Sequence, residues 1–304
     1  MGRAPLLMLG AVLAAASARP TCAQGAGTGD VNAAAAYFAI TSTPLGALPS
    51  MSGPPLGAER GVRVHGAFGY HDPAGAFSRR AYALGVDVPA AQTTVTLTAG
   101  LIDYACDAKE FVREASLPLS GFDCNHALTG GARWFAPLVA GGSVGVASAT
   151  GTAAPRFALG VDASLGIASI DLGEMRIPTD TYPYGPAIGG AYGTLGMTGT
   201  AMTAGIGVPF ALTGRTGGMT LTSYLAPRAA FGRLTSKSRA AGLGPDVAQL
   251  LDEESTESGS RFLLGGGLGI RFGDSAVGVD LGFQHVFVEQ ARTVIGMGVA
   301  YDRW

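Results

Sequence analysis

Residues 262–287 read FLLGGGLGIRFGDSAVGVDLGFQHVF, and this stretch decides the fold. Up to Phe272 most of the large apolar residues share one parity, and most of the glycines, with Arg271, take the other. After Gly-Asp-Ser at 273–275 the alternation resumes, again with glycines and one charge, Asp280, between the apolar residues. A period of two residues on both sides of a turn signal predicts a β-hairpin. One face of this hairpin is apolar, and the other carries mostly glycine. A soluble sheet would need a core to cover that apolar face.

The same alternation recurs along the chain, at 62–70, 81–88, 94–101, 157–167 and 201–210. No helical segment is available to cover a shared core, as a soluble sheet of this size would need. Strands of about ten residues, apolar outside and polar inside, are typical of a transmembrane β-barrel, whose closure leaves no backbone edge unpaired in lipid. The sequence therefore predicts an all-β fold, a closed antiparallel transmembrane β-barrel, with a soluble secreted β-sandwich as the alternative.

The alternation predicts about twelve strands, with ten to fourteen allowed. The predicted strands are 61–70, 78–88, 92–104, 126–135, 141–149, 156–168, 189–197, 201–212, 218–232, 261–272, 276–288 and 292–303. A change of parity separates the strands on either side of 198–200. With short periplasmic turns and longer extracellular loops, loops 105–125 and 233–260 fall outside. Segment 169–188 is then an unusually long periplasmic turn.

Three regions divide the chain. Residues 1–23 have Arg3, an apolar core and a small-residue cleavage site, which predicts a cleaved signal peptide. Residues 24–60 are rich in Ala, Gly and Pro, and they are consistent with a periplasmic extension, a plug in the lumen or an extra strand. Residues 61–304 form the predicted barrel domain.

Composition and cysteine content limit the function classes. The 304 residues are 47% hydrophobic and only 14% charged, with a net charge of −2, so no basic surface for nucleic acid is expected. Cleavage of the signal peptide leaves two cysteines, Cys106 and Cys124, and in an exported protein this pair predicts a disulfide. No set of residues has metal-ligand spacing, so neither a metal nor another cofactor is expected.

The chain ends in TVIGMGVAYDRW, a last alternating strand that closes on an aromatic residue. The residues that carry the pattern are Ile295, Met297, Val299, Tyr301 and Trp304. This ending resembles the C-terminal signature of bacterial outer-membrane β-barrels, the porin-like superfamily. The resemblance implies a location in the bacterial outer membrane, and it implies outer-membrane lipid and the barrel assembly machinery as partners. It leaves the oligomeric state open.

Polar residues with inward parity are the candidate lumen residues: Arg63, His65, Asp87, Arg133, Asp162, Arg271, Asp280 and Gln284. The residues beside them on the inner face are small and would leave an open lumen, and the charged side chains would set an electric field across it. The favoured function is therefore a passive, porin-like channel for small solutes or ions. The alternative is a non-conducting structural or surface-interaction barrel that acts through loops 105–125 and 233–260.

An enzyme is the third hypothesis, and it rests on three loop residues, His71, Asp72 and His126, which could form an acid/base pair at the outer rim. Solvated loop side chains explain the same residues, so no catalytic residue is assigned and the chain is expected not to be an enzyme.

Overall fold

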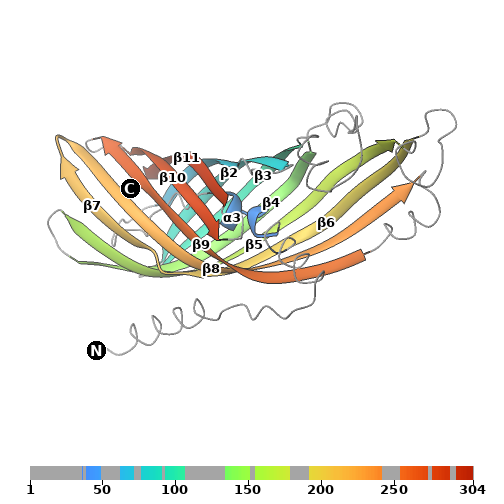
Figure 1. Cartoon of the computed structure of the whole chain (residues 1–304). Helices are drawn as coiled ribbons and strands as arrows, with labels where there is room; N and C mark the ends of the chain where they lie inside the picture. Colours follow the sequence, from blue (N-terminus) through green and yellow to red (C-terminus); the bar gives the residue numbers. More distant parts are fainter. Residues whose placement is uncertain are drawn as a thin grey trace.

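The computed structural model describes residues 36, 39–48, 62–71, 77–90, 93–106, 134–150, 155–178, 192–241, 254–272, 276–287 and 292–303. They form one sheet of eleven antiparallel strands that closes on itself as a barrel, with the short helix α3 (Pro44–Ala47) inside it (Figure 1). Within this described part, no helix is long and apolar enough to cross a membrane.

The strands follow the alternating stretches of the sequence. They are β1 (Val62–His71), β2 (Phe77–Ala90), β3 (Thr93–Cys106), β4 (Trp134–Thr150), β5 (Arg156–Pro178), β6 (Tyr192–Gly207), β7 (Phe210–Thr216), β8 (Met219–Ala241), β9 (Glu254–Phe272), β10 (Val277–Phe287) and β11 (Arg292–Arg303). The first strand pairs with the last, and β4 pairs with β5, which completes the ring. No long unpaired sheet edge is therefore left between the described strands.

The ring has ten positions, because β6 and β7 share one of them. Gly207 of β6 pairs with Asp162, and Phe210 of β7 pairs with Leu159, so the register on β5 continues across the break. The break contains Pro209, which has no N–H to give to a ladder. One can start at Thr220 in β8 and step from each residue to its registered partner on the next strand. One full circuit of the ring then returns to β8 at Gly232, twelve residues further on. Such a stagger means tilted strands, at roughly 35–45° to the axis in closed barrels.

The fold class and the range of ten to fourteen strands are confirmed, but two of the predicted divisions are wrong. The described part of 126–135 and all of 141–149 belong to the single strand β4, and 189–197 and 201–212 share one position as β6 and β7. Across 198–200, β6 keeps an unbroken register with β8, while β5 opposite has an irregularity between Asp171 and Glu174. The irregularity lies in β5 and not in β6, so the parity change in the sequence at 198–200 does not mark the end of a strand.

Because these predicted strands merge, some connections lie at a different end of the barrel from the one predicted. Both ends of the barrel domain and the short connections 91–92, 151–154, 217–218 and 273–275 lie at one end, the turn end. The long connections 107–133, 179–191 and 242–253 lie at the other, the loop end. The expected long periplasmic turn at 169–188 is therefore wrong, because its residues continue β5 and then connect at the loop end. Residues 233–241 and 254–260, expected in a loop, instead extend β8 and β9.

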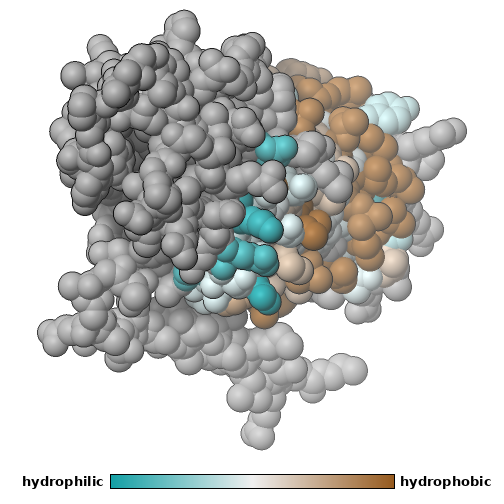
Figure 2. All heavy atoms as spheres, turned by 90° about the vertical axis from the view of Figure 1, so that its right-hand side faces the viewer, coloured by the Kyte–Doolittle hydropathy of each residue, from teal (hydrophilic) through white to brown (hydrophobic). Residues whose placement is uncertain are grey.

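Outward side chains form an apolar belt. On β5 it runs from Phe157 to Ile167, and on β9 from Phe262 to Phe272, eleven residues in each case. Transmembrane strands need about 9–11 residues. Leu165, in this belt, is 70% exposed. Figure 2, viewed from the loop end, shows this surface in brown with hydrophilic residues in teal beside it. An apolar surface of this extent requires lipid or another partner to cover it.

The two-residue hairpin between β7 and β8 gives a first prediction. Gly217 and Gly218 have φ values of 55° and 79°, a region that L side chains occupy at a cost of roughly 1–2 kcal/mol. Gly218→Ala is expected to lower the free energy of unfolding by about that amount in urea titrations. Gly214→Ala is the control, because a Cβ there meets nothing within 4 Å. Equal losses in both variants would contradict a turn-specific effect.

Candidate functional site: the barrel lumen

Part of the N-terminal region lies inside the ring. We call residues 39–48 the lumen segment; its residues 39–43, with Leu45 and Leu48, are at most 8% exposed. Three backbone hydrogen bonds, each donated to the carbonyl three residues earlier, fold the segment tightly. Helix α3 begins with Pro44, whose fixed φ suits a first helical position. Gly46 lies so close to the carbonyl of Ile40 that no Cβ would fit.

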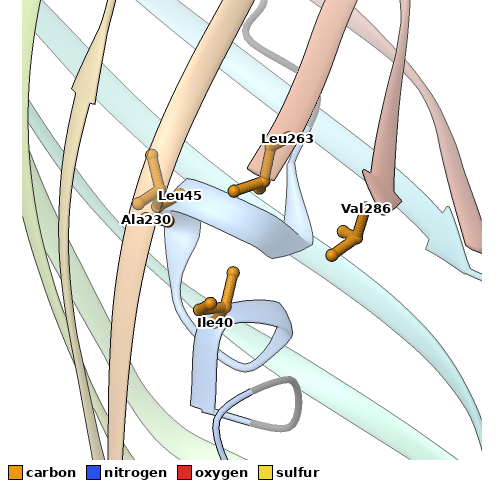
Figure 3. Packing of buried hydrophobic residues seen from close by; sticks show 5 residues of the cluster. All are labelled: Ile40, Leu45, Ala230, Leu263 and Val286. Atoms are coloured by element: carbon orange, nitrogen blue, oxygen red, sulfur yellow. The ribbon is translucent and has the colours of Figure 1, made fainter. Parts of the chain in front are cut away.

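The lumen segment contacts opposite walls of the barrel. Helix α3 contacts the five strands β1 to β5. On the other side, Ile40 and Leu45 pack against Ala230 of β8, Leu263 of β9 and Val286 of β10 (Figure 3). Every residue of this cluster is at most 8% exposed, so the segment fills the lumen at this level.

Two wall residues hold the segment by hydrogen bonds. The Thr43 hydroxyl donates to the Ile40 carbonyl at 3.1 Å, and it therefore accepts from the Thr203 hydroxyl at 2.8 Å. The Gln284 amide donates to the Leu45 carbonyl at 2.5 Å, and Gln284 is only 1% exposed. A buried hydrogen bond adds about 1 kcal/mol, so the polar contacts reinforce the apolar packing.

Glycines of the wall make room for the segment. A Cβ on Gly232 would lie 2.6 Å from the Ala36 carbonyl oxygen and 2.8 Å from Ile40 Cγ1. A Cβ on Gly205 would lie 2.8 Å from Leu45 Cδ2. A ring of ten strands is close to the size that side chains alone can fill. The small residues of this wall therefore accommodate a chain segment instead.

This fit gives a second prediction. Gly232→Ala should displace the lumen segment and speed hydrogen exchange in peptides that cover 36–48, measured by mass spectrometry. Gly265→Ala is the matched control, because it is also an inner-wall glycine but its Cβ would meet only ordinary contacts of 3.7 Å or more. Unchanged exchange in Gly232→Ala would mean that the segment does not depend on this contact.

Charged side chains line the lumen toward the turn end. Arg228 of β8 donates to one oxygen of Asp162 through Nη2 at 2.6 Å and through Nε at 3.1 Å. Arg63 of β1 lies 3.3 Å from Asp280 of β10. These side chains are at most 22% exposed, so each charge is largely withdrawn from water and depends on its partner.

A third polar group joins β1, β2 and β3. Thr96 donates to Asp87 at 2.6 Å, and His65 Nδ1 lies 3.5 Å from the other Asp87 oxygen. The His65 ring lies over Gly85, its registered partner on β2, where a Cβ would come within 2.2 Å of the ring. Among the described residues, no three His, Cys, Asp or Glu side chains gather as they would around a metal ion.

Inner glycines recur opposite the polar side chains. Asp162 lies over Gly207 and Asp280 over Gly269, its registered cross-strand neighbours, with oxygen atoms 2.2 and 2.4 Å from where a Cβ would stand. A side chain in a tilted strand leans over the next strand, and only glycine leaves room for it there. The glycine-rich inner face seen in the sequence therefore holds polar groups and the lumen segment.

The structure brings most of the candidate lumen residues to the inner wall. These are Arg63, His65, Asp87, Asp162, Arg271, Asp280 and Gln284. Arg133 lies outside the described residues. Gln284, expected to face the lumen, contacts the lumen segment there.

Sequence reasoning missed three inner-wall residues, Arg228, Tyr224 and Thr203. Arg228 shares the parity of Ala226 and Ala230, so the alternation of β8 contained the signal. Tyr224 is 5% exposed, and its hydroxyl has no hydrogen-bond partner within the described part of the chain. Thr203 had no signal of its own, because its role depends on a segment far away in sequence.

Several predicted sites lie partly or wholly outside the described residues. Cys106 ends β3, but Cys124 is outside, so the disulfide stays a prediction. Asp72 and His126 are also outside, so the acid/base pair with His71 stays a hypothesis.

In the last strand, the apolar residues of the C-terminal pattern face outward. Ile295, Met297, Val299 and Tyr301 are each at least 49% exposed, whereas Ala300 between them is fully buried. Trp304 lies outside the described residues. Recognition by the assembly machinery stays a prediction.

Comparison with known proteins gives similarity in fold. No protein-family model and no curated protein matches the chain. The outer membrane protease OmpT of Escherichia coli is similar in structure, with 8% identity over 81% of this chain and 98% of that chain, and a TM-score of 0.43. The N-terminal β-barrel domain of Pseudomonas aeruginosa OprF has 11% identity over 83% and 100%, with a TM-score of 0.26. Ail of Yersinia pestis, the attachment invasion locus protein, has 10% identity over 80% and 97%, with a TM-score of 0.29. Here the closed barrel follows from the chain's own strand pairing.

Proposed function

We propose that the chain is an integral β-barrel of the bacterial outer membrane, and that its lumen conducts small polar solutes or ions only when the lumen segment leaves it. The apolar belt supports the membrane location, because its length on β5 and β9 matches the hydrocarbon thickness. Export after cleavage at 1–23 and assembly through the C-terminal strand belong to the same proposal. The orientation follows the usual pattern of such barrels, with the turn end in the periplasm.

The seating of the lumen segment between opposite walls carries the proposal. Its residues 39–43 are at most 1% exposed, and the Thr203 and Gln284 contacts hold it from two sides. Without the segment, the wall glycines would leave a passage. The charges toward the turn end, which include Asp162, Arg228 and Asp280, would then set the field that selects ions.

Single-channel recording in planar bilayers tests the proposal. The chain from Gln24 is expected to be silent, whereas the same chain without residues 36–48 should give stable steps of one conductance. Barrel-like circular dichroism of both proteins controls for folding. A further variant, Thr43→Cys with Thr203→Cys, should join the segment to the wall once mass spectrometry shows the cross-link. Any conductance of the intact chain under applied voltage should vanish in the cross-linked form and return on reduction.

Two outcomes would overturn this function. Equal conductance with and without the segment would mean that the segment does not close the lumen. A deletion variant that folds as a barrel but stays silent would mean that the barrel is no channel.

The second candidate is a non-conducting barrel that acts through its outer surface. The observation that favours it is the extension of β5, β6, β8 and β9 beyond the apolar belt at the loop end. Exposed sheet surface of this kind is suited to binding. Unchanged binding to surface partners after deletion of 240–257 would count against it.

A further inference from the structure

The extended strands carry registered rows of polar side chains on their outer face. One row contains only hydroxyls: Ser169, Thr200, Thr235 and Thr256. The next row outward is Asp171, Thr198, Lys237 and Glu254. Neighbouring strands lie about 4.7–4.9 Å apart, so each row is a regular array. The hydroxyls of Thr235 and Thr256 are 3.2 Å apart, and the other members of both rows are exposed.

Arg233 and Lys237 are two cations of this face, and Glu254 is registered directly beside Lys237. Arg233 and Lys237 are exposed, and neither forms an ion pair or a side-chain hydrogen bond among the described residues. Arg233 is registered with Met202 and Ser258, so it lies at the border where the apolar belt ends. Lys237 is four residues further along β8, roughly 13 Å along the strand. The border itself is visible in Figure 2, where teal meets brown.

Just inside this border, the outer wall is hollowed. A hollow of about 750 Å³ crosses β3 to β6, β8 and β9, and most of its lining is made by outward side chains. Leu165, Ile206 and Phe231 are large members of the lining, and small residues such as Ala163 and Ala204 stand between them. Phe231 is the outward residue directly before Arg233 on β8, so the hollow runs up to the first cation.

We infer that the hollow and the polar rows together bind a phosphorylated glycolipid of the leaflet at the loop end, an inference that rests on the proposed membrane insertion. An acyl chain fills the hollow, because this part of the wall lies in the belt and any occupant there is lipid. The guanidinium of Arg233 and the ammonium of Lys237 bind phosphate. The hydroxyl row provides donors and acceptors for sugar hydroxyls.

Native mass spectrometry of the chain from Gln24 in detergent tests this assignment, with diphosphoryl lipid A, phosphatidylglycerol and phosphatidylcholine as probes. Lipid A is expected to bind at least tenfold more tightly than phosphatidylcholine. Arg233→Gln and Lys237→Gln should each weaken lipid A binding about fivefold. Thr200→Val should weaken lipid A binding but not phosphatidylglycerol binding. Arg215→Gln, an exposed arginine at the turn end, is the matched control and should change nothing.

The outcomes separate this inference from the proposed function. Flotation with phosphatidylcholine vesicles reports insertion alone, so protein that fails to float contradicts the membrane location itself. Protein that floats but binds the three lipids equally overturns only the glycolipid site. Equal losses in Arg215→Gln and Arg233→Gln, or phosphatidylglycerol binding as tight as that of lipid A, would also overturn it.

Discussion

Arg228→Met is expected to lower the free energy of unfolding by about 3–5 kcal/mol, the largest effect of any single substitution considered for this barrel. The substitution leaves Asp162 charged, with a side chain that is only 9% exposed, and removes the two nitrogens that bind it. An unpaired carboxylate in such a place has neither water nor a cation to compensate it. Equilibrium urea unfolding in phospholipid vesicles measures the loss.

The double variant Asp162→Asn with Arg228→Met is the control for this prediction. With both charges removed, most of the lost stability should return, because replacing a buried pair costs little compared with breaking it. A loss below about 1 kcal/mol in Arg228→Met alone would show that water reaches Asp162 and that this part of the lumen is wet.

Leu281→Arg should cost about 2–4 kcal/mol when the protein is folded in a bilayer. Leu281 is 52% exposed, it lies in the middle of the apolar belt on β10, and its registered neighbours Leu268 and Met297 are also exposed and apolar. A guanidinium at this depth has no water and no partner within the belt. Urea unfolding of the two proteins in vesicles gives the difference.

Thr200→Arg is the matched control, because Thr200 also faces outward but lies beyond the belt on β6. Its expected cost is roughly 0–1 kcal/mol, as for charges near the interface. A Leu281→Arg variant that is as stable as Thr200→Arg would contradict a lipid-facing belt and would favour a barrel surrounded by water.

Alternation alone was enough to predict the class of fold and the facing of most strands. The hairpin at 262–287 shows why: a period of two, apolar on one face, has the same meaning in every strand of a closed barrel. The inward charges, from Arg63 to Asp280, followed from parity for the same reason, because each residue's face depends only on its own strand.

The local sequence pattern could not predict where strands begin, end or merge. The parity change at 198–200 resembled a turn, but β6 continues there because β8 pairs with it without a break. The sequence also offered no boundary between the membrane-facing part of β8 and its extension, since one strand runs through both. Strand ends depend on pairing partners, and these partners are far apart in the chain.

The occupant of the lumen depended wholly on the tertiary structure. Residues 39–48 contain no period and no motif, and their place was open between an extension, a plug and a further strand. They lie inside because wall glycines such as Gly232 leave the space and because Thr203 and Gln284 supply the hydrogen bonds. Local sequence determines which face of a strand is apolar, since that is a property of neighbouring residues. Whether the ring encloses an open lumen or a filled one depends on contacts across more than a hundred residues, and these exist only once the barrel has closed.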